Sequence, residues 1–366
     1  MTNKEREILE IIRENPTIEQ SEIASLLDIS RSTVAVHISS LQKQGYIVGK
    51  GYLLSKENYV VGIGASNVDV YGTSKIKIRT HYDHPADIRS SVGGVMHNII
   101  TNFTKLGGNG KLITAYSDDI YGKTIVEDCR NNNIDISHSL LVKDKTSGIF
   151  MQIQDDNNDM YLAICDMSIL ESITPEYLRS KENIITNAKL VVMDPSLDNK
   201  SIEELIEICK DKVPIYIDPI SDNFALKMKP YVPYFELIKP NRGELESLAD
   251  MKIKNDEDLY KACQSLLDRG LKKIIVSLSQ DGVLYMDKDQ KIRRKFKEEK
   301  KMVNASGAGD ALMGALVYCE VNGYEIDETI DYMLAGGIAA IRSAGTINKD
   351  MSIDLLKEII KEKKTK

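Results

Sequence analysis

A chain of 366 residues exceeds the usual limit of a single hydrophobic core, so we expect two domains. Its 42% apolar and 28% charged residues are ordinary for a globular protein, and its net charge of −7 argues against a protein that coats nucleic acid over its whole surface. No apolar run approaches the ~18 residues that a membrane span needs, and the first residues are too polar for a signal peptide. Five scattered cysteines without a Cys-x-x-Cys pair indicate reduced thiols, so we expect a cytoplasmic protein.

The N-terminal region has the pattern of a small helical domain. An apolar stripe predicts a helix over residues 4–14, and a second short helix is expected over 21–27. Ser30 stands where an N-cap would begin a third helix over 31–44. Two short strands around a Gly-Lys-Gly turn are expected over 46–54. Three helices followed by a hairpin are the outline of a winged helix-turn-helix.

This expected domain, residues 1–56, is polarised in charge. Residues 29–56 hold four basic and no acidic residues, which gives +4, whereas residues 1–28 hold three basic and seven acidic residues, which gives −4. Such a distribution suits a helix in the major groove and a wing on the phosphates, so DNA is an expected partner. A protein-interaction or dimerisation domain that does not touch DNA is the alternative.

In the remaining residues, 57–366, strand-like and helical patterns alternate as they do in an α/β domain. Continuous rather than alternating apolar runs indicate strands buried on both faces, hence a mostly parallel sheet sandwiched by helices. These runs predict strands over 59–64, 111–117, 190–194, 214–219, 236–241 and 273–279, and helical patterns lie between most of them, as over 96–106, 201–210 and 259–269. Two interruptions, around 70–90 and 148–164, predict a small β-lid off the main sheet.

The strongest chemical motif is Gly307-Ala308-Gly309-Asp310, which opens a helix without another charge until Glu320. Unpaired backbone N–H groups and the helix dipole make such a helix start an anion site. A carboxylate beside it is placed to take a proton from an attacking hydroxyl. A glycine turn in which Asp310 is an ordinary N-terminal cap is the alternative.

This motif resembles the signature of the PfkB, or ribokinase-like, family of small-molecule kinases. The resemblance covers essentially all of residues 58–362 and implies a ribokinase-like kinase that uses ATP. It implies that Asp310 is the catalytic base and that the amides of Gly307, Ala308 and Gly309 form the anion hole.

Two more motifs resemble the family's sugar site. Gly93-Gly94-Val95-Met96-His97-Asn98 is similar to its second signature, which implies that Gly93, Gly94 and Asn98 line that site. Asn67 and Asp69 follow the first strand, where the family binds sugar hydroxyls. A carboxylate suits a vicinal diol because it can accept from both hydroxyl groups. Alone, each of these motifs is more typical of a turn or a cap.

Two later motifs resemble the nucleotide and magnesium sites. Asn241-Arg242-Gly243-Glu244 fits the family's Asn-x-x-Glu element, which implies that Asn241 and Glu244 act on Mg²⁺ and phosphate. Ser277, Ser279 and Gly282 stand where the family's Thr-x-Gly-x-x-Gly lies, and Asn241 is expected to contact the nucleotide as well. These residues follow predicted strands, at the sheet edge where α/β proteins bind ligands. Ser279 replaces a glycine, which puts close approach of its backbone to the adenosine in doubt.

A narrower resemblance is to the pseudouridine kinase branch. It is carried by the segments 164–169, 173–178, 216–221 and 237–241, and by Gly-Gly-Val in place of the Gly-Gly-Lys of ribokinases. It implies transfer of the ATP γ-phosphoryl group to a hydroxymethyl group, the 5′-OH of pseudouridine. Asp166 is our candidate for contacting the base, with a cap of the turn after the lid strand as the alternative.

A monovalent cation and a second copy of the chain are two further partners to consider. Asn304-Ala305 stands where many relatives have Asp-Thr near a monovalent-cation site, so activation by K⁺ is undecided. Lid strands with free edges often pair across a two-fold axis, so we expect a homodimer. Two alternatives stay open, namely a transcription regulator that uses the kinase fold as a ligand sensor and a kinase of another nucleoside or sugar.

Overall fold

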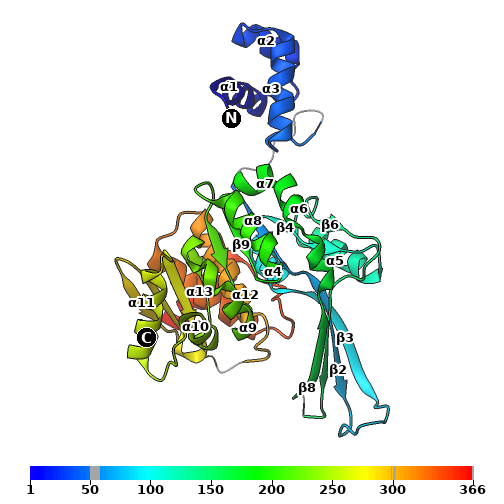
Figure 1. Cartoon of the computed structure of the whole chain (residues 1–366), viewed down its shortest axis with the longest axis vertical. Helices are drawn as coiled ribbons and strands as arrows, with labels where there is room; N and C mark the ends of the chain where they lie inside the picture. Colours follow the sequence, from blue (N-terminus) through cyan, green and yellow to red (C-terminus); the bar gives the residue numbers. More distant parts are fainter. Residues whose placement is uncertain (50–57, 158, 298, 300–301, 365–366) are drawn as a thin grey trace.

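The computed structural model describes residues 1–49, 58–157, 159–297, 299 and 302–364. A small helical domain lies at one end of a larger α/β domain, and a sheet projects from the other end of the larger domain (Figure 1). Among the described helices, none is both long and apolar enough to cross a membrane.

The small domain contains α1 (Asn3–Glu14), α2 (Gln20–Leu27) and α3 (Arg31–Lys43). The predicted N-cap of α3 is confirmed, because the Ser30 Oγ accepts a hydrogen bond from the Thr33 N–H at 3.1 Å. The three helices enclose their own apolar core, which includes Ile8, Ile12, Ile23, Val34 and Leu41. Most of the hairpin expected over 46–54 lies outside the described residues.

The large domain is built on one sheet, and among the described residues its strand order is β14-β13-β12-β11-β10-β9-β1-β4. The strands from β4 to β12 in this order are parallel, and β13 and β14 are antiparallel to their neighbours. Their bounds are β1 (Tyr59–Ile63), β4 (Asn109–Ile113), β9 (Leu190–Met193), β10 (Ile215–Ile217), β11 (Leu237–Ile238), β12 (Lys273–Ser277), β13 (Val283–Asp287) and β14 (Lys291–Arg294). The predicted, mostly parallel sheet is confirmed.

Helices cover both faces of this sheet, because alternate side chains of one strand enter two different cores. Val61 and Ile63 of β1 lie in one core, whereas Val60 lies in the other. The first core is closed by α6 (Pro175–Ser180), α7 (Glu182–Thr186), α8 (Asn199–Cys209), α9 (Asp222–Met228), α10 (Arg242–Ala249) and α11 (Asp256–Asp268). The second is closed by α4 (Val95–Lys105), α5 (Ile120–Asn131), α12 (Ala308–Val321), α13 (Ile326–Ile341) and α14 (Ile353–Lys364).

The projecting sheet consists of β2 (Asn67–Ser74), β3 (Ala86–Gly93), β7 (Ile149–Gln154) and β8 (Met160–Asp166), in the order β3-β2-β7-β8. It occupies the two segments predicted as lid strands. A short turn, η1 (Ser168–Ser172), leads from β8 back to α6, and a second, η3 (Ser279–Asp281), separates β12 from β13. The strands β5 (Ala115–Tyr116) and β6 (Leu140–Leu141) form a separate parallel pair.

Candidate active site

Asp310 lies in the first turn of α12, which begins after Gly307. Gly307 has a φ of 78°, and a Cβ at this position would lie 2.1 Å from the carbonyl oxygen of Thr346, so the turn requires glycine. The N–H groups of Ala308 and Gly309 belong to the same first turn, where the helix offers them no acceptor. The start of α12 therefore combines free amides, of the kind that can bind an anion, with a carboxylate.

Asn98 joins the two glycine motifs. Its Nδ2 donates a hydrogen bond to Asp310 Oδ2 at 2.8 Å, although 212 residues separate them in the chain. Asn98 lies in the first turn of α4, directly after the pair Gly93-Gly94. The bond fixes the Asp310 carboxylate in one direction and brings the two predicted signatures together.

Two buried charges lie close to Asp310. Lys239 Nζ is 3.0 Å from Asp218 Oδ2, and a Cβ on Gly309 would lie 3.7 Å from the same ammonium. Burial and the negative charge of Asp218 raise the pKa of Asp310 to about 7. The hydrogen bond from Asn98 and the charge of Lys239 act in the opposite direction. A carboxylate with a pKa near neutrality is suited to general-base catalysis at neutral pH.

The residues expected to bind the sugar lie together at the base of the lid. Asp69 accepts hydrogen bonds from Asn67 Nδ2 at 2.6 Å and from the Tyr71 hydroxyl at 3.2 Å. A Cβ on Gly93 would lie 2.2 Å from Asp69 Oδ2, and Gly94 has a φ of 96°. The lack of a side chain at Gly93 therefore lets the Asp69 carboxylate pack against the turn that precedes α4. Burial raises the pKa of Asp69.

Asn241 and Glu244 form a capping box at the start of α10. Asn241 Oδ1 accepts from the Glu244 N–H at 3.0 Å, and the two Glu244 oxygens accept from the Asn241 N–H and Nδ2 at 2.8 and 2.7 Å. Burial and the negative Asp218 raise the pKa of Glu244 to about 7. Among the described residues, no group of three or more His, Cys, Asp or Glu is arranged to hold a metal. Mg²⁺ in proteins commonly keeps several water ligands and takes one or two protein oxygens, which Asn241 and Glu244 can supply.

The predicted nucleotide loop lies beside this capping box. The Ser277 N–H donates to the Pro240 carbonyl at 2.9 Å, which joins the end of β12 to the start of α10. Ser279 has a φ of 51°, so it adopts the left-handed conformation that favours glycine. Gly282 has a φ of 80°, and a Cβ there would lie 2.0 Å from the Arg294 carbonyl oxygen. The serine therefore preserves a glycine-like backbone at the position where the family has glycine.

Asp166 lies at the end of β8, exposed to solvent. Its Oδ1 accepts a hydrogen bond from the Ser168 N–H at 2.9 Å, and this bond lowers the pKa of the carboxyl group. In this conformation the side chain caps the turn after the lid strand, which is the alternative that the sequence left open. Contact with a nucleobase remains a prediction.

Several groups near the site were missed by the sequence analysis. Asp194, Asp218 and Lys239 each come directly after a strand, so their position at a strand end was the available signal. Asp194 Oδ2 accepts from the Ala65 N–H at 2.9 Å, and its burial raises its pKa.

His97, within the second glycine motif, is a core residue of α4. It is fully buried, and its Nε2 lies 2.9 Å from Asp128 Oδ2. The hydrogen bond to Asp128 raises the pKa of His97 to about 10 against the opposing effect of burial. The pair formed by His97 and Asp128 therefore links α4 to α5 next to Asn98.

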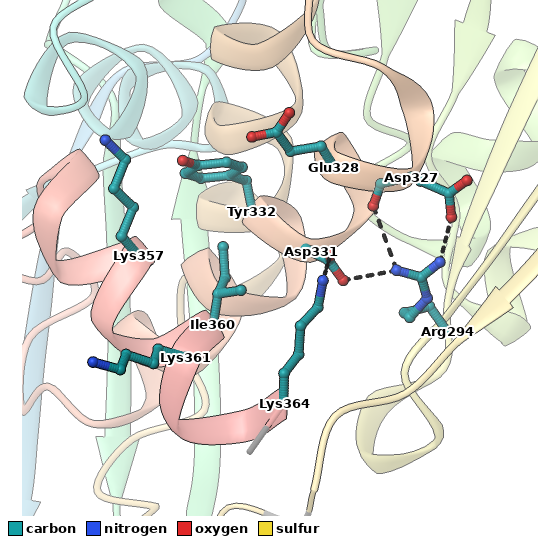
Figure 2. A pocket seen from close by; sticks show the side chains of 9 residues that line it. All are labelled: Arg294, Asp327, Glu328, Asp331, Tyr332, Lys357, Ile360, Lys361 and Lys364. Atoms are coloured by element: carbon teal, nitrogen blue, oxygen red, sulfur yellow. Dashed lines mark hydrogen bonds and ion pairs between the residues drawn. The ribbon is translucent and has the colours of Figure 1, made fainter. Parts of the chain in front are cut away.

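A hollow of about 540 Å³ lies elsewhere, between β14, α13 and α14 (Figure 2). None of its lining residues is one of the predicted site residues. Four of its charged side chains pair with one another, since Arg294 binds Asp327 and Asp331, and Lys364 also binds Asp331. These pairs tie α14 to α13 and β14.

Comparison with known proteins agrees with this geometry. Residues 57–353 match the model of the pfkB family of carbohydrate kinases, and residues 1–48 match a winged helix-turn-helix DNA-binding model. The chain is similar to the uncharacterised sugar kinase YeiI of Escherichia coli K12, with 33% identity over 95% of this chain and 96% of the relative. It is 29% identical to the pseudouridine kinase of the same organism, over 82% of this chain and 96% of the relative.

Among solved structures, the chain is similar to Arabidopsis thaliana ribokinase complexed with ribose and ATP. The TM-score is 0.73 at 19% identity, and the similarity covers 82% of this chain and 99% of that one. At this identity the likeness shows the fold. Together with the family match, it places a ribokinase-like domain behind a winged helix-turn-helix. The chain therefore belongs to the PfkB family of carbohydrate kinases, which transfer a phosphoryl group to an alcohol.

Proposed function

We propose that the protein is an ATP-dependent nucleoside kinase that phosphorylates the 5′-OH of pseudouridine. The observation that carries the proposal is the bond from Asn98 to Asp310, because it sets a base of near-neutral pKa between the sugar residues and the amides of α12. The 29% identity to a pseudouridine kinase supports the substrate. A phosphorylation screen tests it, with ATP consumption measured over nucleosides and free sugars. Turnover of none of them would favour the alternative of a ligand-sensing regulator.

In the proposed reaction, Asp310 takes the proton of the attacking hydroxyl. The hydroxyl oxygen forms a bond to the γ-phosphorus, the bond from that phosphorus to the bridging oxygen breaks, and ADP leaves. The first-turn amides of α12 and the ammonium of Lys239 are placed to stabilise the negative charge that shifts during transfer. Asp69 and Asn67 would hold the ribose hydroxyls in reach of the base.

The carboxylates near α10 fit a magnesium ion held through water. Asp218 and Asp222 both raise the pKa of Glu244, so an added cation would relieve their repulsion. When bound with the nucleotide, Mg²⁺ supplies charge neutralisation on the phosphates. Asn241 and Glu244 are the residues that would orient its water ligands.

Replacing Glu244 with glutamine is expected to raise the Mg²⁺ concentration needed for half-maximal activity by about 10-fold or more. The KM for the nucleoside should change much less, because Glu244 lies at the nucleotide side of the site. Magnesium titrations of kcat/KM measure both effects. Glu257→Gln, an exposed change of the same kind on α11, is the control. A magnesium titration of Glu244→Gln that overlays the wild type would remove Glu244 from this role.

We also propose that residues 1–56 form a DNA-binding domain. Affinity for DNA from the protein's own upstream region should fall steeply as salt rises, because basic side chains displace counterions from the phosphates. Fluorescence anisotropy at several salt concentrations measures the slope. No binding even at low salt would favour a protein-interaction domain instead.

Deleting residues 1–56 is expected to leave a folded kinase with kcat/KM close to that of the full chain. The physical reason is that the small domain has a core of its own, separate from the two cores of the large domain. Steady-state kinetics and thermal unfolding check the expectation. An insoluble or inactive product would show that the domains depend on one another and that the proposed boundary is wrong.

We propose that the lid is the interface of a homodimer. Its register places Met151 opposite Ile164, and Ile153 opposite Leu162. These four side chains are exposed, as is Ile88, which the register places in the row of Ile153. Val70 of β2 shares a row with Met151 and Ile164, so its neighbour Asp69 lies on the opposite face of the lid. A second copy of the lid would bury the apolar face and leave the polar face with Asp69 open. The register places Asp166 on the apolar face, so this interface and a contact of Asp166 with the base would compete for one surface.

A further inference from the structure

The kinase domain contacts the recognition helix through α7, which lies directly below the small domain (Figure 1). Asn183 Nδ2 donates to the Lys43 carbonyl at 3.2 Å, and Asn187 Nδ2 donates to the Gln44 carbonyl at 2.9 Å. Lys43 is the last residue of α3 and Gln44 is its C-cap. Terminal carbonyls of a helix have no partner within it. Two amides of the kinase domain therefore cap the C-terminus of α3.

Two further contacts give this interface a defined shape. The Tyr46 hydroxyl donates to Asn187 Oδ1 at 3.0 Å. Gly45 has a φ of 80°, and a Cβ there would lie 2.9 Å from Ile184 Cδ1. The glycine thus permits the turn after α3 and also lets the Ile184 side chain approach. Tyr59 of β1 donates to the Ile184 carbonyl at 2.8 Å, which ties α7 to the main sheet.

The contact leaves the DNA-facing end of α3 uncovered. Recognition helices of this class contact base edges mainly with their N-terminal residues. Ser30, Arg31 and Ser32 lie at that end and are exposed, while the kinase domain holds the other end. Docking on α7 is therefore compatible with DNA binding, and it fixes the direction in which α3 points.

The same helix is linked to the substrate site by a short segment. A Cβ on Gly148 would lie 3.0 Å from Met167 Sδ and 3.1 Å from Asn67 Cβ, so Met167 lies beside a residue of the sugar site. From Met167 the chain passes through η1 and α6 into α7. Ile169 and Leu170 of η1 are buried in the core that also contains Ile185 of α7. A change at the base of the lid can therefore be transmitted to α7 through side chains that pack against one another.

We infer that α7 is the docking surface for the protein's own winged-helix domain, and that nucleoside binding at the base of the lid alters this docking and thereby the affinity for DNA. The inference rests on the proposed nucleoside kinase activity. Among the residues that the structure describes, the contact includes three hydrogen bonds and the approach of Ile184 to Gly45. Polar interfaces between domains permit relative motion. Coupling between two binding sites is reciprocal, so DNA should change nucleoside affinity by the same factor.

Hydrogen exchange of the full-length protein tests the docking. In Asn183→Ala/Asn187→Ala, amides over residues 41–47 should exchange at least about 10-fold faster than in wild type, because a lost cap exposes the end of α3. Asn131→Ala/Asn199→Ala, two exposed changes of the same kind on α5 and α8, is the control. Unchanged exchange over 41–47 would refute the docking surface, whatever the protein phosphorylates.

The second part of the test adds pseudouridine with a non-hydrolysable ATP analogue. In wild type, this should change exchange over 41–47 and shift DNA affinity by at least about 5-fold. In the double variant both responses should be lost, while kcat/KM for the nucleoside stays near wild type. No response in wild type, or the same response in the variant, would overturn the coupling. Absence of any nucleoside turnover would instead refute the proposed function, and the exchange difference between wild type and variant would still decide the docking.

Discussion

Replacing Asp310 with asparagine is expected to lower kcat by ~10³-fold or more, with the KM values for ATP and nucleoside close to those of wild type. The asparagine side chain has nearly the same shape, so the start of α12 and the surrounding contacts should persist. It cannot take a proton, and a positioned base acts mainly in the transition state. Steady-state kinetics with both substrates measure the effect. Activity within tenfold of wild type would exclude Asp310 as the base.

The pH dependence gives an independent measure of the same group. Asp310 must be deprotonated to act, and its pKa is raised to about 7. Wild-type kcat/KM should therefore fall as the pH drops below about 7, and rise no further above it. The pKa of Glu244 is also raised to about 7, so Glu244 adds to the same limb, and in Asp310→Asn the limb should become shallower in the residual activity. Asp354→Asn, an exposed carboxylate on α14, is the matched control and should keep both the rate and the pH limb.

The fold could be predicted largely from the sequence because its strands are buried on both faces. Runs such as 190–194 have no polar residue before their last position, which leaves a central parallel strand as the consistent reading. The lid was predicted only in outline, since Ala86–Gly93 is polar and almost fully exposed. Such a strand is specified by its partner β2 rather than by its own apolar pattern.

The candidate site was also predicted only in part. Gly307, Gly93 and Gly94 were identified because their backbone conformations or close contacts exclude other residues, which leaves a visible motif. Asp218 and Lys239 belong to no such motif. Their ion pair joins the ends of two neighbouring strands, so it follows from the fold and is not visible in either segment alone. The docking of the small domain on α7 was equally hidden, since surface asparagines such as Asn187 are ordinary in a sequence.

Pseudouridine is expected to exceed uridine by at least ~10²-fold in kcat/KM. The two nucleosides present the same ribose to Asp69 and Asn67, so these residues cannot distinguish them. The glycosidic bond of pseudouridine is to carbon, which leaves its ring one more N–H than uridine has. An acceptor buried on binding would be satisfied by this N–H and left unpaired by uridine, and an unpaired buried acceptor is costly.

Asp166 is the proposed acceptor, and two variants separate this role from its function as a cap of the turn. Asp166→Ala removes both functions, whereas Asp166→Asn retains an oxygen for the Ser168 N–H. If Asp166 contacts the base, both variants should shrink the ratio of pseudouridine to uridine turnover. If it only caps the turn, alanine should lower both rates alike and asparagine should change little. Asp156→Ala, an exposed residue of the turn between β7 and β8, should leave the ratio unchanged. Pseudouridine would be refuted as the substrate if the wild type turned over the two nucleosides equally, or only free sugars. Either result would still agree with a kinase of the PfkB family.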